Sequence, residues 1–248
     1  MEMSPTNVEA SGTSSASLGA LVFRHRLSVR IWHWVNAVTI FVMLMSGLGI
    51  FNAHPMLYWG QYGANLDTPW LTLDRFPSWA TIPGDYSLAL SRHWHLAFAW
   101  VLGFGLLFYF VRSLWNRHLQ KDIALSVTEV APSHLWADIK KHARLDFSES
   151  EARYNPLQKI TYSLILFVVL PVVILTGLCM SPGFGGVTPW LTDLFGGRAS
   201  ARSIHFICAA LISAFIILHV VLVILAGPIN EMRSMITGKF RLSSEKPS

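Results

Sequence analysis

The stretch that decides the fold runs from Arg202 to Ile229 and reads RSIHFICAALISAFIILHVVLVILAGPI. It is long and apolar enough to cross a bilayer as a helix, yet it contains two histidines, His205 and His219, fourteen residues apart. At about 100° and 1.5 Å per residue, this offset falls within about 40° of four full turns and rises about 21 Å. Both imidazoles therefore project from nearly one face, at two depths of a hydrocarbon layer about 30 Å thick. Because an ionisable side chain inside a membrane is costly, we expect both histidines to face the bundle interior and to be functional.

The composition of the whole chain also indicates a membrane protein. The 248 residues are 52% hydrophobic and only 13% charged, with a mean hydropathy of +0.44, whereas a soluble domain is about 25% charged. The formal net charge of +5 does not indicate a nucleic-acid partner, because the Lys and Arg residues flank the apolar runs, where they determine orientation. No CxxCH motif occurs, which excludes covalently attached c-type haem.

Four apolar runs have about the length needed to cross a bilayer. We predict spans at about residues 31–51, 93–111, 160–180 and 203–226. Pro171 interrupts the third span, and a kink there is tolerable because neighbouring helices can satisfy the freed carbonyl. The predicted fold class is therefore an all-α membrane protein, a bundle of four transmembrane helices.

The remaining segments complete the predicted organisation. Residues 1–20 are rich in Ser, Thr, Ala and Gly and are predicted to be a disordered tail. Residues 21–241 form one domain, and residues 242–248 form a C-terminal tail. The second loop, 112–159, is charged and is predicted to lie inside, and within it we expect a short amphipathic helix carrying Leu135, Trp136 and Ile139.

The distribution of basic residues predicts the orientation. With the N-terminus inside, the outer loops hold few basic residues, namely Arg75, Arg92, Arg198 and Arg202. Both termini are thus predicted to be cytoplasmic, in a bacterial inner membrane. The outer loops are 52–92, which is rich in Trp and Tyr, and 181–202, which is rich in Gly and Pro.

This orientation gives each membrane histidine a depth. His33 and His219 lie toward the cytoplasmic face, whereas His205 and either His93 or His95 lie toward the periplasmic face. Two level pairs suit two six-coordinate b-type haems, since each iron takes one imidazole nitrogen on each axial side. A zinc site fits less well, because neither pair has a neighbouring carboxylate or thiolate to complete a tetrahedron.

The choice between His93 and His95 is left open by periodicity. The two positions are about 200° apart on a helix, so only one can face the fourth span. We favour His95, which is deeper and has the small Ala99 one turn on. Gly47, fourteen residues after His33, is expected to face the core at the periplasmic level.

Four arginines at the membrane ends are candidates to bind haem propionates, because Arg pairs bidentately with carboxylates. Interfacial anchoring and topology account for them equally well. These residues are Arg30, Arg92, Arg198 and Arg202.

The pattern resembles the bacterial cytochrome b561 family, which includes the cytochrome b subunits of nickel-iron hydrogenases. The resemblance rests on RIWHWVNA (30–37), RHWHLAFAW (92–100) and the His-x13-His of the last span, and it covers residues 22–240. The segment TPWLTDLFGGRASARSIHF (188–206) looks most like the thiosulfate-reductase-type cytochrome b subgroup. Carried over by position, the resemblance makes His33 and His219 ligands of one haem b and His95 and His205 ligands of the other.

The resemblance also implies partners. Members of that subgroup are typically paired with a periplasmic, molybdopterin-dependent oxidoreductase and exchange electrons with membrane quinone. Since two axial histidines leave no open iron position, we expect electron transfer rather than catalysis by this chain alone. The alternatives are a stand-alone cytochrome b561 passing electrons from a small donor such as superoxide to quinone, a hydrogenase cytochrome b subunit, and a haem-free anchor or transporter.

Overall fold

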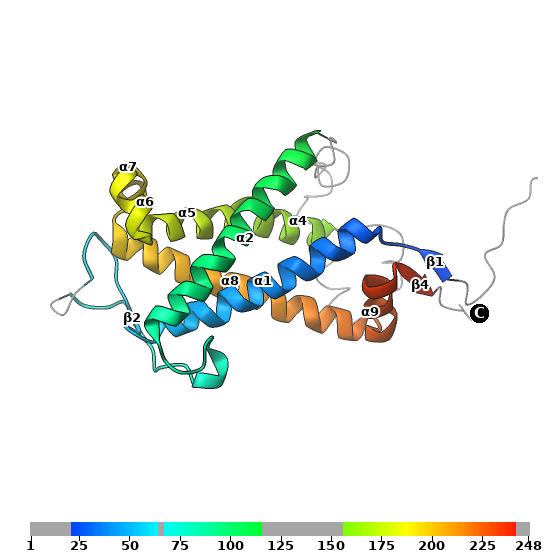
Figure 1. Ribbon diagram of the computed structural model, residues 1–248, viewed down its shortest axis with the longest axis horizontal. Helices are drawn as coiled ribbons and strands as arrows, with labels where there is room; N and C mark the ends of the chain where they lie inside the picture. Colours follow the sequence, from blue (N-terminus) through cyan, green and yellow to red (C-terminus); the bar gives the residue numbers. More distant parts are fainter. Residues whose placement is uncertain (1–20, 64–66, 116–155, 242–248) are drawn as a thin grey trace, which may run out of the picture. The chain divides into compact units, whose positions relative to one another are not determined.

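A computed structural model describes residues 21–63, 67–115 and 156–241 of the chain (Figure 1). The two expected tails and the amphipathic helix expected at Leu135, Trp136 and Ile139 lie outside these residues. The chain divides into two compact units: one is His33–Ala226, and the other joins the residues up to Trp32 with those from Gly227 onward.

The described residues contain four helices that are long and apolar enough to cross a membrane, as the sequence predicted. Three of them are α1 (Leu27–Phe51), α2 (Leu88–Trp115) and α8 (Arg198–Leu225). Each begins about one turn earlier than predicted. The reason is that backbone hydrogen bonding continues past the arginines that seemed to end the spans, because a long Arg side chain can reach polar surroundings from inside the first turn.

The third span is built from three pieces: α4 (Pro156–Leu164), a π-helical turn η3 (Ile165–Val169) and α5 (Leu170–Met180). Pro171 lies in the first turn of α5. Proline has no N–H to donate and clashes with the carbonyl four residues before it. The π-turn therefore lies where proline most disturbs an α-helix, and the predicted interruption takes this form.

Helix α5 packs along α8, as Figure 1 shows. A buried apolar cluster joins them, formed by Val169, Val173, Cys208 and Ile212. Many other large apolar side chains on the four helices remain exposed, including Phe41 and Phe104, each 62% exposed. Such a surface suits contact with lipid rather than with water.

The loop between α1 and α2 is folded onto the start of α8. Strands β2 (Met56–Leu57) and β3 (Leu71–Thr72) pair in it as a short antiparallel ribbon, and a 3-10 turn, η1 (Ser78–Ala80), follows. The Ser203 hydroxyl donates to the Tyr58 carbonyl at 2.6 Å and accepts the indole N–H of Trp70 at 3.0 Å. The loop is thus fastened to the end of the helix that carries His205.

The loop between α5 and α8 contains two short helices where the sequence suggested only a Gly- and Pro-rich loop. These are α6 (Pro182–Val187) and α7 (Pro189–Leu194). Each begins with a proline, whose fixed φ suits the first helical position and whose missing N–H has no intrahelical partner there. Gly197 precedes α8 with φ 108° and lies against the backbone of Gln61, which brings this loop into contact with the loop between α1 and α2.

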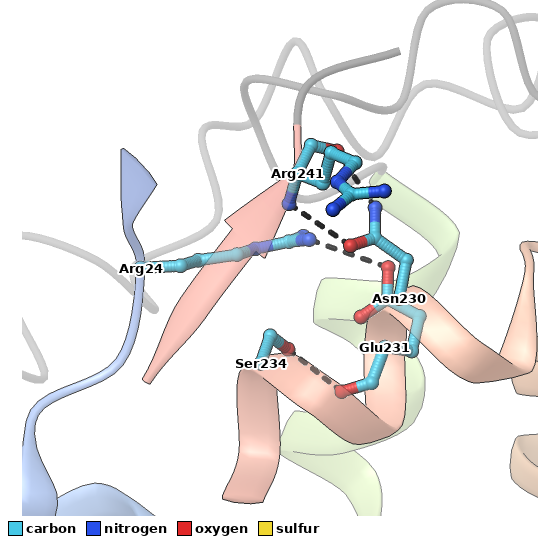
Figure 2. Close-up of polar contacts among 5 residues, drawn as sticks. All are labelled: Arg24, Asn230, Glu231, Ser234 and Arg241. Carbon is cyan, nitrogen blue, oxygen red and sulfur yellow. Dashed lines mark hydrogen bonds and ion pairs between the residues drawn. The ribbon is translucent and has the colours of Figure 1, made fainter. Parts of the chain in front are cut away.

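The other unit joins segments from the two ends of the chain. Strand β1 (Leu21–Phe23) pairs antiparallel with β4 (Lys239–Arg241), and α9 (Pro228–Thr237) precedes β4. Figure 2 shows the polar contacts: Arg24 pairs with Glu231 at 3.2 Å, and the Asn230 side chain bonds the backbone N–H and carbonyl of Arg241. We call this unit the terminal clasp.

Candidate functional site

Two pairs of histidines face each other between the spanning helices. His95 of α2 lies opposite His205 of α8, with ring centroids 6.1 Å apart and ring planes at 59°. His33 of α1 lies opposite His219 of α8, with centroids 6.5 Å apart and planes at 53°. The four histidines named by the sequence are thus brought together in the two expected pairs.

The spacing within each pair fits one metal ion held between two imidazoles. A bond from a first-row metal to an imidazole nitrogen is about 2 Å long, so two bonds on opposite sides separate the nitrogens by about 4 Å. The ring centroids lie about 1 Å behind each nitrogen, which gives a centroid separation of about 6 Å for bis-histidine ligation. The separations of 6.1 and 6.5 Å agree with this value.

The contacts of His95 determine which of its nitrogens is free to bind a metal. Its Nδ1 lies 3.1 Å from the carbonyl oxygen of Met43 and 3.1 Å from Oγ of Ser46. A carbonyl can only accept, so Nδ1 carries the proton and donates it. The unprotonated Nε2 is then the atom that could bind a metal, and this is the tautomer that a metal-binding histidine adopts when its other nitrogen donates to oxygen.

His205 has a matching neighbour. Its Nδ1 lies 3.1 Å from Oγ1 of Thr176 on α5. The Thr176 hydroxyl donates its own proton to the helix, with the carbonyls of Val172 at 2.7 Å and Val173 at 3.1 Å. It therefore accepts from His205, which leaves Nε2 of His205 unprotonated as well.

Each of these two rings also lies against a glycine. A Cβ at Gly47 would be 3.3 Å from Cε1 of His95, and a Cβ at Gly177 would be 3.4 Å from Cε1 of His205. Gly47 is thus at the expected level, but its neighbour is the histidine ring itself. Both glycines let a ring approach the helix backbone more closely than a side chain would allow.

The His33–His219 pair has aromatic neighbours instead. The Trp34 ring meets His33 edge-on at 5.2 Å, and the Phe215 ring stacks on His219 at 6.1 Å with planes 18° apart. Aromatic rings at such distances interact with the histidine rings through their quadrupoles and exclude water from them.

His93 and the arginines take other positions. His93 is exposed and does not face His205, so the structure brings together His95 and His205. Arg30 donates to the Met235 carbonyl at 3.4 Å, Arg198 donates to the Met180 carbonyl at 2.8 Å, and Arg202 donates to the His54 carbonyl. Arg92 is exposed.

Sequence reasoning did not find Ser46 and Thr176. Each is fully buried, at 0% exposed, and each precedes a glycine within an apolar span. That hydroxyl–glycine dipeptide is the sequence signal that could have found them. Within the described residues, no group of three or more His, Cys, Asp or Glu side chains could hold a metal ion.

Comparison with known proteins gives one family and two relatives. A model of the prokaryotic cytochrome b561 family matches residues 24–238. The chain is 30% identical over 200 residues to a putative protein-methionine-sulfoxide reductase subunit, YedZ1, of Azospira oryzae, covering 79% of this chain and 88% of the relative. It is 24% identical over 255 residues to a probable Ni/Fe-hydrogenase B-type cytochrome subunit of Cupriavidus necator, covering 93% of each.

Proposed function

The chain belongs to the prokaryotic cytochrome b561 family of haem b electron-transfer proteins, and on this premise we propose that it holds two b haems, one between His33 and His219 and one between His95 and His205. The observation that carries the proposal is the equal spacing of the two pairs, 6.5 and 6.1 Å between ring centroids. A single pair with this spacing could arise by chance. Two pairs that share helix α8, each with the spacing expected for two ligands of one metal ion, support two similar sites.

The residues of the chain have defined tasks in this proposal. The haem supplies one-electron chemistry when bound. His33 with His219 and His95 with His205 would hold the two haems, and two imidazoles on each iron would leave no position for oxygen or substrate. The apolar surroundings of α5 and α8 keep water away. Helix α8 supports both sites, about 21 Å apart along its axis, and so connects the two sides of the membrane.

Orientation and partner form the second half of the proposal. The N-in, C-in orientation in the inner membrane places the His95–His205 pair and the exposed Trp59, Tyr62 and Trp79 on the periplasmic side. An oxidoreductase would dock there, and electrons would pass between it and membrane quinone. The two relatives support such a partner, since each is named as a subunit of a redox enzyme. A molybdopterin-dependent enzyme remains our choice, with a hydrogenase as the second candidate.

We propose one main propionate partner, Arg202, among the four candidate arginines, which are Arg30, Arg92, Arg198 and Arg202. Arg202 is the best placed, because it lies one turn before His205 and its guanidinium is 5.8 Å from the centre of the Phe51 ring in the bundle. Arg30, Arg198 and Arg202 each also donate to a backbone carbonyl.

The test is a haem count on the purified protein and on single histidine variants. The wild type should carry two haems per chain in a pyridine haemochrome assay, with a low-spin spectrum. His205→Ala and His95→Ala should lose one and the same haem, and His33→Ala and His219→Ala should lose the other. His93→Ala is the matched control and should keep both.

Two outcomes would overturn this function. Protein that carries no haem would leave a membrane anchor or transporter. The second outcome is that the 27.8 kDa protein is extracted from native membranes without a partner, contains haem and reduces quinone with electrons from a small donor. That result would favour the stand-alone cytochrome.

A further inference from the structure

The two histidines of the His95–His205 pair are held by matching pieces of two different helices. Ser46-Gly47 of α1 contacts His95, and Thr176-Gly177 of α5 contacts His205. In both places a hydroxyl oxygen lies 3.1 Å from Nδ1 of the ring, and the following glycine adjoins Cε1 of the same ring. Neither α5 nor this part of α1 supplies a ligand, so these contacts have no role yet.

The match continues along the helices. Two residues beyond Gly47, a Cβ at Gly49 would lie 2.4 Å from Oγ of Ser91, one turn before His95. Two residues beyond Gly177, Cys179 shares a buried cluster with Ala201, one turn before His205. At both the α1–α2 and the α5–α8 contacts, small side chains thus allow the helices to approach closely beside a paired histidine.

We propose that Ser46 and Thr176 are a matched pair of positioning residues, which orient His95 and His205 by accepting their Nδ1 protons and which set the reduction potential of the haem between them. The inference rests on the proposed two-haem function and adds to it the residues that tune one of the sites.

The direction of the hydrogen bonds makes this role specific. The Ser46 hydroxyl donates to the Val42 carbonyl at 2.6 Å, as Thr176 donates to Val172 at 2.7 Å. The proton of each hydroxyl is therefore directed at its own helix, and the oxygen lone pairs face the imidazole. An acceptor on Nδ1–H makes Nε2 more basic, which favours the ferric state and lowers the potential.

An ordinary role for these hydroxyls would be to bond only their own helix, which is common for Ser and Thr. Ser213 of α8 does this, donating to the Ala209 carbonyl at 2.9 Å. Ser46 and Thr176 differ because they are completely buried and each reaches a ring nitrogen of another helix.

The experiment is a spectroelectrochemical titration of both haems in the purified protein, with low-temperature EPR of the ferric state. Thr176→Val keeps the shape of the side chain and removes the hydroxyl. It should raise the potential of one haem, by up to about tenfold in the reduction equilibrium, or about 59 mV for a one-electron couple. Thr176→Ser should restore the wild-type value. Ser46→Ala should shift the same haem by less, because the Met43 carbonyl still accepts from His95. Ser213→Ala is the matched control and should shift neither.

The outcomes separate this inference from the proposed function. A wild type without two bis-histidine signals would overturn the function itself. Two normal haems that stay unmoved in Thr176→Val and Ser46→Ala would overturn the inference alone, as would equal shifts of both haems. If Thr176→Val cannot be isolated, Ser46→Ala and Thr176→Ser decide: the first must shift one haem and the second neither.

Discussion

Between the two histidine pairs the ring spacing is nearly the same, at 6.1 and 6.5 Å, but the neighbours of the rings differ in kind. Hydroxyls and glycines surround the His95–His205 pair, whereas Trp34 and Phe215 adjoin the His33–His219 pair. Spacing follows from where the helices run, and tuning follows from what touches the outer side of each ring. The two properties are therefore set by different residues and can be changed separately.

The largest effect is expected from filling the space beside one ring. Gly177→Leu would place a branched side chain where even a Cβ is 3.4 Å from Cε1 of His205. We expect loss of the haem of the His95–His205 pair and retention of the other, measured as haem per chain. Gly103→Leu is the control, because a Cβ there meets nothing within 4 Å. Equal losses in both variants would show that the two sites do not differ in this way.

The next effect concerns the close approach of α1 and α2. A Cβ at Gly49 would lie 2.4 Å from Oγ and 3.1 Å from Cβ of Ser91, so Gly49→Ala requires the Ser91 side chain or the helix backbones to shift. Overpacking of this kind costs about 1–3 kcal/mol, which thermal unfolding of the detergent-solubilised protein would detect. Adding Ser91→Gly should recover most of the loss. A double variant no better than Gly49→Ala would place the strain elsewhere.

A smaller change is expected at the other pair. Phe215→Ala removes the ring stacked on His219, an interaction that contributes about 0.5–1.5 kcal/mol beyond buried area. The haem between His33 and His219 should dissociate faster in a transfer assay to apomyoglobin, while the second haem is unchanged. Phe104→Ala, on the exposed side of α2, is the control. Faster release of both haems would remove the distinction between the sites.

The smallest effect is expected in the terminal clasp. Burial and the neighbouring Arg24 hold the pKa of His25 below its usual 6.5, with Glu231 acting in the opposite direction. Since the unfolded clasp binds the proton more readily, its stability is present above pH 6.5 and falls as the pH drops below that value.

Hydrogen exchange of the β1 and β4 amides, at pH values about one unit above and below the usual histidine pKa of 6.5, measures this effect. Exchange should be faster in acid after correction for intrinsic rates, and His25→Gln should remove the difference. An unchanged pH dependence in that variant would assign it to another group.

The sequence predicted the spans and the four paired histidines because both depend on strong local signals. An apolar run of about 20 residues is costly to place anywhere except in a membrane. A histidine within it is conspicuous, and fourteen residues between His205 and His219 fix a common face.

Ser46 and Thr176 could not be identified in this way. A hydroxyl in an apolar helix most often bonds its own backbone, as Ser213 does, and only the glycine that follows Ser46 and Thr176 separates them from that case. The terminal clasp was not predicted from the sequence for another reason. Its strands are three residues long and pair across more than 200 positions, so they carry no periodic pattern.

The π-helical turn at Ile165–Val169 controls the rotational phase of the span that has no histidine. Such a turn accommodates about one extra residue. Every later side chain therefore lies about 100° from where a continuous α-helix of the same sequence would place it. A helical wheel drawn from α4 straight through α5 would therefore misplace Thr176 and Gly177. A one-residue deletion between this turn and Thr176 would rotate the hydroxyl away from His205, whereas a deletion inside the turn would restore a regular α-helix and keep the hydroxyl in place. When relatives are aligned, a one-residue gap belongs inside this turn, so that the residues matching Thr176 and Gly177 keep the same helical phase.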